Sequence, residues 1–296
     1  MSDFTPVYFS DKYTFTFPLN LKGSSMSDFP LILDAEQLQA NLDSKNLVVI
    51  DLSQPTSYLE HHVPGAYFMD YSWITKAQNP VMGLLPELEQ LNRVLSAFGI
   101  NEETHIVAYD DEGGGRACRL LWTLDTLGHK NYSLLNGGIQ TWLNKQLATS
   151  QDISWPTPSS YSGSLSTAPI ADKQLILDSL DDHNTLILDC RSPMEYSGTK
   201  AFAARGGHIP GAVNMNWMDL IDADNHLQLK TTDAIEAVLE SKGITKDKTI
   251  ITHCQTHHRS SHSYIVLKSL GYENIKGYPG SWSDWGNDPS TPIEIA

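Results

Sequence analysis

The stretch His253-Cys254-Gln255-Thr256-His257-His258-Arg259-Ser260-Ser261 decides how this chain is understood. It follows Thr249-Ile250-Ile251-Thr252, a β-branched apolar run that predicts a buried strand. Apolar residues at helical spacing come next and end at Gly271, a natural helix stop. The local prediction is therefore a strand, a tight loop and a helix, with Cys254 as the first residue of the loop.

Cys254 stands where a loop and a helix start can activate a thiol. The backbone N–H groups of such a loop converge on one point, the helix adds its positive end, and Arg259 adds a fixed charge. Only the thiolate is a strong nucleophile, and a free thiol with a pKa of about 8.5 is mostly protonated until such surroundings lower that pKa. We therefore predict that Cys254 and Arg259 are catalytic and that Cys254 attacks a group attached to an anion.

Two other interpretations of the loop stay open. Most cysteines are buried small hydrophobic side chains without chemistry. A metal site could use the dense group of Cys and His side chains here, but structural zinc sites usually draw on two separated pairs of ligands rich in Cys, so no metal is expected. The candidate ligands are His253, Cys254, His257, His258 and His262.

Composition restricts the class of protein and its partners. The chain has 296 residues, enough for one large domain or two ordinary ones, and its 35 acidic against 20 basic residues give a net charge of −15. That charge argues against general binding to nucleic acid or to an anionic membrane. No apolar run has the length of a membrane span, residues 1–10 carry no secretory signal, and three cysteines do not make a disulfide framework. We expect a cytoplasmic monomer.

The chain divides into two α/β domains. Residues 29–148 and 170–296 each alternate strands with helices, which predicts a parallel sheet with helices on both faces in each. Residues 149–169, rich in Ser, Thr and Pro, predict a linker between them. Residues 1–28 are expected to be an unstructured leader, with a strand over residues 13–17 as the alternative.

The expected elements can be stated residue by residue. One helix is expected to start at Asp233, with Glu236 as its capping partner, and to end before Gly243. The other expected helices cover residues 91–98 and 117–127, and the strands cover residues 47–51, 106–109, 132–135, 186–189 and 250–251.

The two domains are copies of one unit, repeated at a period of roughly 144 residues. His62-Val63-Pro64-Gly65-Ala66 matches His208-Ile209-Pro210-Gly211-Ala212, and Trp142 matches Trp285. In the first copy, Asp110 falls where Cys254 stands, and its loop to Arg116 is one residue longer, acidic and rich in glycine. We predict that the first copy is catalytically silent, packs against the second and walls one side of a pocket at the domain interface.

These features together resemble the two-domain rhodanese-type sulfurtransferases. The resemblance covers residues 30–294 and includes the repeat, both His-Val/Ile-Pro-Gly-Ala turns, the one loop cysteine and the Gly-Ser-Trp-x-x-Trp ending. The Cys-Gln-Thr-His-His-Arg loop is similar to that of a bacterial thiosulfate sulfurtransferase subgroup. The resemblance implies that Cys254 takes a sulfane sulfur from thiosulfate as a persulfide and passes it to cyanide or a cellular thiol, a protein thiol included. It implies no metal or organic cofactor.

Several further residues are candidates for substrate binding. His257 and His258 would donate to substrate oxygens or titrate near neutrality, with a solvated surface as the alternative. Trp282 would wall the pocket, with core packing as the alternative, and Arg191 would bind substrate or form a structural ion pair with Asp189. The candidate set is Gln255, Thr256, His257, His258, Ser260, Arg191 and Trp282.

The remaining cysteines and one loop neighbour are expected to be structural. Cys118 lies in a predicted helix and Cys190 beside a predicted strand, and both are expected to be inert. His253 precedes the catalytic cysteine at the end of a strand, where a structural role is expected.

Two rival functions share parts of this pattern. Animal rhodaneses carry basic residues where this chain has Gln255 and Thr256, and an anion-binding Arg where it has Glu195, so the choice of sulfur donor stays open. Phosphatases and arsenate reductases also place a Cys-loop-Arg before a helix, but the loop of residues 254–259 is one residue shorter than in the phosphatases of the same fold. A persulfide relay protein would use the same residues as a sulfurtransferase.

Overall fold

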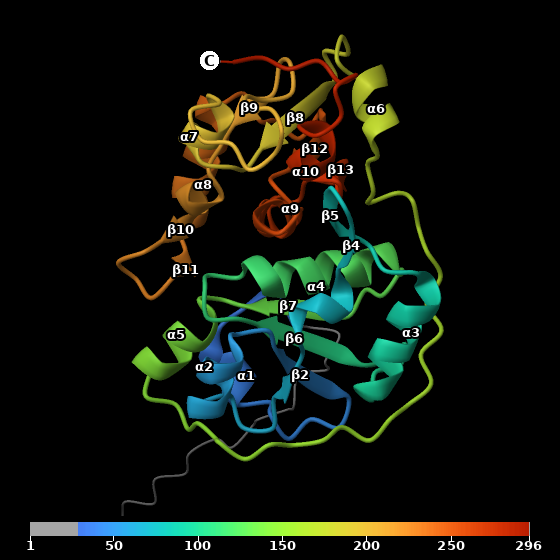
Figure 1. The fold of residues 1–296 in the computed structure, drawn as a ribbon. Coiled ribbons are helices and arrows are strands. Elements are labelled where there is room, and N and C mark those ends of the chain that lie inside the picture. Colours follow the sequence, from blue (N-terminus) through green and yellow to red (C-terminus); the bar gives the residue numbers. More distant parts are fainter. Residues whose placement is uncertain (1–28, 296) are drawn as a thin grey trace, which may run out of the picture.

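The computed structural model describes residues 29–295, so the predicted leader over residues 1–28 lies outside the described residues. Figure 1 shows two α/β domains, one above the other, with helices α4 (Gly115–Thr126) and α9 (Arg259–Ser269) facing each other between them. The predicted fold class is confirmed. Within the described part of the chain, no helix is long and apolar enough to cross a membrane.

The first domain is built on a parallel sheet with the strand order β1-β7-β6-β2-β3. Its strands are β1 (Ile32–Leu33), β2 (Leu47–Asp51), β3 (Tyr67–Phe68), β6 (His105–Tyr109) and β7 (Tyr132–Leu135). Besides α4, its helices are α1 (Ala35–Gln39), α2 (Pro55–Glu60), α3 (Leu88–Ala97) and α5 (Gly138–Asn144), with a 3₁₀ turn η2 (Tyr71–Ile74).

The second domain repeats this plan with the parallel order β13-β12-β8-β9. Its strands are β8 (Thr185–Asp189), β9 (Val213–Asn214), β12 (Thr249–His253) and β13 (Ile275–Gly277). Besides α9, its helices are α6 (Lys173–Asp178), α7 (Pro193–Tyr196), α8 (Thr232–Ser241) and α10 (Ser281–Trp285), with a 3₁₀ turn η3 (Trp217–Leu220).

Strand residues alternate between two apolar layers, which explains their continuous hydrophobic runs. In β12, Ile250 packs into the core layer that contains α9, whereas Ile251 packs on the other face with Trp282 and Trp285 of α10. In the first domain Trp142 of α5 occupies the place that corresponds to Trp285 and closes the outer layer there. The sheets are therefore covered on both faces, and the two matched tryptophans are core residues.

Helix α4 is buried on nearly every side because it lies between its own sheet and α9 of the second domain. Its side chains include the fully buried Trp122. Asp125 at its end accepts from Tyr264 Oη and from Lys268 Nζ of α9, each at 2.6 Å. The predicted packing of the first copy against the second is therefore present in the structure.

The predicted strands and helices are present in the structure, with some of their ends shifted. The short helices α1, α2, α5, α6, α7 and α10 and the short strands β1, β3, β9 and β13 were not predicted. Helix α8 begins at Thr232, and its cap is Thr231, whose side chain accepts from the N–H of Ala234 at 3.4 Å. The predicted start at about Asp233 is thus one residue late, and the predicted capping pair of Asp233 and Glu236 is wrong because Thr231 is the cap. Two antiparallel hairpins went unpredicted, β4 (Lys76–Gln78) with β5 (Val81–Leu84) and β10 (Ile221–Asp222) with β11 (Gln228–Leu229).

The β4–β5 hairpin of the first domain reaches across to the second (Figure 1). The N–H of Met82 donates to Ser283 Oγ at 2.9 Å, and this hydroxyl donates to the carbonyl of Met82 at 3.0 Å. A Cβ on Gly83 would lie only 2.2 Å from the carbonyl oxygen of Thr256. Position 83 therefore requires a glycine for two reasons. Its φ of +80° is unfavourable for other residues, and the Cys254 loop approaches too closely for a Cβ.

We predict that Gly83→Ala disturbs the Cys254 loop in the other domain. Gly65 has nearly the same φ, +78°, but a Cβ there would meet nothing within 4 Å, so Gly65→Ala is a matched control for backbone strain alone. Both variants should lose about 1–2 kcal/mol of stability to the left-handed conformation. Only Gly83→Ala should also slow alkylation of Cys254 by iodoacetamide, and equal alkylation rates in the two variants would contradict this.

Candidate active site

Cys254 lies at the carboxyl end of β12, beside the end of β8. His253 is paired with Asp189 across these two parallel strands, and Cys254 is the next residue. In open α/β sheets ligands bind outside the carboxyl ends of the strands, so this is the expected edge for a site. The predicted strand, loop and helix are present, and α9 begins at Arg259, so that its first turn faces the cysteine.

The thiol of Cys254 is fully buried and yet has a lowered pKa. Burial acts to raise this pKa, but the charge of Arg259 lowers it. Hydrogen bonds from the Ser260 side chain and from the backbone of Ser260 and Thr256 lower it further. The net effect is a pKa below the ordinary thiol value, which favours the nucleophilic thiolate.

Arg259 is held in place by a bidentate ion pair with Glu195. Its Nη1 and Nη2 donate to the two carboxylate oxygens at 2.7 and 2.8 Å. Burial raises the pKa of Glu195, but the Arg259 interaction outweighs it and lowers that pKa to about 2. Glu195 is itself held by Ser192, whose Oγ donates to it at 2.8 Å. The arginine charge is thus permanent, oriented and partly compensated.

Ser281, in the last helix of the second domain, accepts hydrogen bonds that fix the backbone of the Cys254 loop. The backbone N–H groups of Cys254 and His257 donate to Ser281 Oγ at 3.3 and 3.0 Å. Ser281 and His257 both have positive φ, +50° and +54°, which is strained for residues other than glycine. The first domain has Gly138 at the matching position, with φ +55°. A serine where the repeat has such a glycine was the signal by which sequence analysis could have found Ser281.

The two loop histidines occupy different surroundings. His257 is fully buried, its Nδ1 lies 2.7 Å from Ser260 Oγ, and its ring contacts Trp122 of the first domain edge-on at 4.3 Å. Burial holds the pKa of His257 well below its usual value, so the ring is neutral. The solvated-surface alternative is therefore excluded for His257. His258 is partly exposed, and its Nε2 hydrogen bonds to Glu112 of the first domain.

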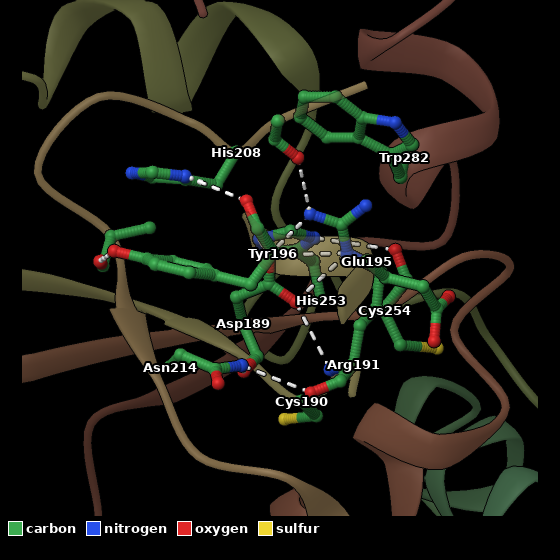
Figure 2. A network of polar contacts seen from close by, with 12 residues as sticks. Asp189, Cys190, Arg191, Glu195, Tyr196, His208, Asn214, His253, Cys254 and Trp282 are labelled. Atoms are coloured by element: carbon green, nitrogen blue, oxygen red, sulfur yellow. Dashed lines mark hydrogen bonds and ion pairs between the residues drawn. The ribbon is translucent and has the colours of Figure 1, made fainter. Parts of the chain in front are cut away.

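Arg191 and Trp282 form a buried stack behind the loop. Arg191 donates to Asp189 Oδ2 at 2.6 Å and to the carbonyl of Gly207 at 2.8 Å. Figure 2 shows its guanidinium against the Trp282 ring, and the distance to the ring centroid is 4.3 Å. The contacts of Arg191 therefore match the structural ion pair rather than a free substrate-binding group. Those of Trp282, which is fully buried, match core packing.

The remaining loop candidates line the catalytic loop itself. Gln255 donates through Nε2 to the carbonyl of Phe202 at 3.2 Å, and its Oε1 is buried without a hydrogen-bond partner among the described residues. Thr256 faces the first domain, and its carbonyl accepts from Arg119 at 3.3 Å. Ser260 is fully buried between Cys254 and His257. Gln255 and Thr256 thus lie in the loop, whereas Ser260 lies in the first turn of α9.

The three side chains that were expected to be structural, those of His253, Cys118 and Cys190, are fully buried. His253 lies 3.6 Å from Asp189, and burial lowers its pKa to about 4, so it is neutral near pH 7. Burial raises the pKa of Cys118 and of Cys190 well above the ordinary thiol value. Both cysteines are therefore protonated and poor nucleophiles, unlike Cys254.

In the first domain, the Asp110 carboxylate occupies the centre of the loop that matches the Cys254 loop. Asp110 Oδ1 accepts from the N–H groups of Glu112 and Gly114 at 3.0 and 2.7 Å, and Oδ2 accepts from those of Arg116 and Ala117 at 2.9 Å each. The N–H groups that would hold an external anion are thus already occupied. This geometry accounts physically for the predicted silence of the first copy.

Three first-domain side chains that sequence analysis missed face the Cys254 loop. Glu112 holds His258, Arg119 donates to loop carbonyls, and the ring of Tyr71 lies 5.6 Å from that of His258. The Oη of Tyr71 is buried and has no hydrogen-bond partner among the described residues. The repeat could have pointed to Glu112, which lies in the matching loop, but no local pattern marks Arg119 or Tyr71.

The dense Cys and His cluster does not form a metal-binding arrangement in the part of the chain that the structure describes. No three side chains of His, Cys, Asp or Glu among residues 29–295 lie as ligands of one ion. The geometry offers a nucleophile, a fixed cation and converging hydrogen-bond donors, which is the equipment for attack on an anionic group.

Comparison with known proteins identifies the family. The Rhodanese-like domain model matches residues 34–145 and again residues 172–288. The chain belongs to the rhodanese family. A thiosulfate sulfurtransferase of Azotobacter vinelandii is 44% identical over 273 residues, covering 91% of this chain and 100% of the relative. One of Pseudomonas aeruginosa is 41% identical over 272 residues, covering 92% and 100%.

A solved structure supports the fold of this rhodanese. The anaerobic ergothioneine biosynthesis enzyme of Chlorobium limicola, in complex with trimethyl histidine, superposes with a TM-score of 0.81. The match covers 90% of this chain and 70% of that one at 22% sequence identity. At that identity the likeness concerns the fold alone.

We predict that the Arg259–Glu195 pair sets the reactivity of Cys254. In the wild-type protein, the pH midpoint for alkylation by iodoacetamide should lie below the ~8.5 of a free thiol. Arg259→Gln should raise this midpoint by about 1–2 units, because the thiolate loses its nearest cation. Glu195→Gln should lower it, because a carboxylate no longer offsets that cation.

The exposed Arg93→Gln variant on α3 is the control, since Arg93 forms a surface ion pair with Glu89, away from Cys254. Midpoints that are the same in the Arg259→Gln and Arg93→Gln variants would show that Arg259 does not control the thiol.

Proposed function

We propose that this rhodanese is a thiosulfate sulfurtransferase that works through a persulfide on Cys254. The observation that carries the proposal is a fully buried thiol with a lowered pKa at a loop and helix start, in a chain 44% identical to a thiosulfate sulfurtransferase. Cys254 is the nucleophile and Arg259 its charge partner. Cys254 has no exposed surface, so the side chains that cover it move aside when the donor enters.

In the first step the Cys254 thiolate attacks the outer sulfur of thiosulfate. The new bond joins this sulfur to Sγ, the S–S bond of thiosulfate breaks, and sulfite leaves with the electron pair. Sulfite is already a stable anion, so the step needs no strong general acid. This fits surroundings in which His257 is held neutral and carries no ready proton.

In the second step an acceptor takes the terminal sulfur. Cyanide or a thiolate attacks this sulfur, the S–S bond of the persulfide breaks, and the Cys254 thiolate is regenerated. The Arg259 charge and the Ser260 and Thr256 hydrogen bonds that stabilise the thiolate also favour its return as a leaving group. Gln255, His257, His258 and Ser260 are proposed to contact the substrates; we also propose a cytoplasmic, monomeric enzyme.

The phosphatase and arsenate reductase alternative has less support. The loop of this chain, residues 254–259, is shorter than the loop of those phosphatases, so it offers fewer N–H groups to enclose a tetrahedral oxyanion. Two of the loop's N–H groups, those of Cys254 and His257, are already donated to Ser281. Neither the Rhodanese-like domain match nor the two curated relatives favour it.

Steady-state kinetics with thiosulfate and cyanide test the function. We predict thiocyanate formation with ping-pong behaviour, seen as parallel double-reciprocal lines, because sulfite leaves before cyanide reacts. Phosphate release from p-nitrophenyl phosphate should be absent. Intersecting lines would contradict the persulfide route, and thiocyanate formed only with mercaptopyruvate would change the donor but keep the class.

A further inference from the structure

Arg119 is a buried arginine of the silent first domain that contacts the catalytic loop of the second. It lies on α4 and is fully buried. Its Nη1 donates to the carbonyl of Thr256 at 3.3 Å and, more weakly, to that of His257 at 3.5 Å. Its Nη2 donates to the carbonyl of Leu84 in the β4–β5 hairpin at 3.2 Å.

The charge of Arg119 has no carboxylate partner. A buried cation is costly unless a nearby negative charge balances it. Within residues 29–295, Arg119 forms no ion pair with any Asp or Glu, and it lies 5.0 Å from the centroid of the Trp122 ring. Burial lowers the pKa of Arg119, while the negative charges of ionised Tyr71 and Cys254 act to raise it. Burial raises the pKa of Tyr71 to about 12, so of these two groups Cys254 is the one that can carry a negative charge near neutral pH.

Arg119 also helps to fix one peptide plane of the loop. The peptide unit between Thr256 and His257 has its carbonyl held by Arg119 and its N–H held by Ser281 Oγ at 3.0 Å. Because a peptide unit is planar, holding both ends fixes its orientation. The next residue along, His257, has the strained φ of +54°, which such fixing can maintain. The preceding N–H, that of Thr256, is one of the groups whose hydrogen bonding lowers the pKa of Cys254.

The internal repeat shows that this position faces the opposite domain in both copies. With Arg116 matched to Arg259, Arg119 corresponds to His262, three residues further along each helix. His262 of α9 approaches the loop of the first domain, since a Cβ on Gly114 would lie 3.3 Å from its ring. Each helix therefore sends this side chain to the other domain's loop, and the charged one reaches the loop that carries the thiol.

We propose that Arg119 is a positioning residue of the active centre, supplied by the domain that does not contain Cys254. It holds the Thr256–His257 peptide so that the loop's donors face Cys254, and it places a buried positive charge beside the loop that carries this thiol. The proposal deepens the sulfurtransferase function and rests on it.

The test compares Arg119→Met with Lys268→Met. Lys268 also joins the two domains across the α4–α9 interface, through Asp125 at 2.6 Å, but contacts no residue of the Cys254 loop, so its variant controls for a loosened interface. Arg119→Met should raise the pH midpoint of Cys254 alkylation by about one unit. It should also lower kcat/KM for thiosulfate by roughly tenfold or more. Lys268→Met should leave both quantities near their wild-type values.

Arg119→Lys keeps the charge but loses the fork that reaches two carbonyls, so it should show a smaller rise of the midpoint. It also serves as the test if Arg119→Met does not fold. A folded Arg119 variant with the wild-type midpoint and kcat/KM would overturn the proposal. So would an equal shift in Lys268→Met, which would assign the effect to the interface as a whole.

The two claims can fail separately. Absence of thiocyanate formation by the wild-type protein would remove the proposed function, whereas the alkylation midpoints report on Arg119 without any turnover.

Discussion

The negative charge of a fully buried thiolate is the constraint on which the site depends. Burial alone would keep Cys254 protonated, so neighbouring groups must stabilise the negative charge of its thiolate. Arg259 supplies the nearest charge, the start of α9 and the loop supply N–H donors, and Ser281 fixes the loop that carries them. Placement at the carboxyl ends of two parallel strands brings these elements together. A second buried arginine, Arg119, contacts the same loop and has no carboxylate partner among residues 29–295.

The two copies of the unit use one loop geometry for opposite purposes. In the first, the Asp110 carboxylate accepts four backbone N–H groups and closes the site from within. In the second, the Cys254 sulfur takes the place of that carboxylate, and the N–H groups of Cys254 and His257 donate to Ser281 Oγ. The first domain is still needed, because α4 covers the loop and the β4–β5 hairpin packs Gly83 against Thr256. The geometry of the Cys254 loop therefore depends on contacts from the first domain.

Much of this could be predicted from the sequence, and the part that could not has a common cause. Short apolar runs, glycine stops and the repeated His-x-Pro-Gly-Ala turn located both domains, strands β2, β6, β7, β8 and β12 and helices α3, α4, α8 and α9, because these signals are local. The shorter helices and strands gave no comparable signal. The Cys254 loop was recognisable for the same reason. The Arg259–Glu195 and Arg119–Thr256 contacts join residues far apart in the chain, and nothing in their local pattern reveals them. The two hairpins were missed because their strands are short and lie at the domain edges, where apolar alternation is weak.

The measurement that tests the central claim most directly is the intact mass of the purified protein before and after thiosulfate, followed by cyanide. The account predicts a gain of one sulfur atom on the peptide that contains Cys254, and its loss to cyanide as thiocyanate forms. Cys118→Ser should show the same gain, and Cys254→Ser should show none while remaining folded. No gain in the wild-type protein with any sulfane-sulfur donor, or a gain that persists in Cys254→Ser, would contradict a persulfide on this residue.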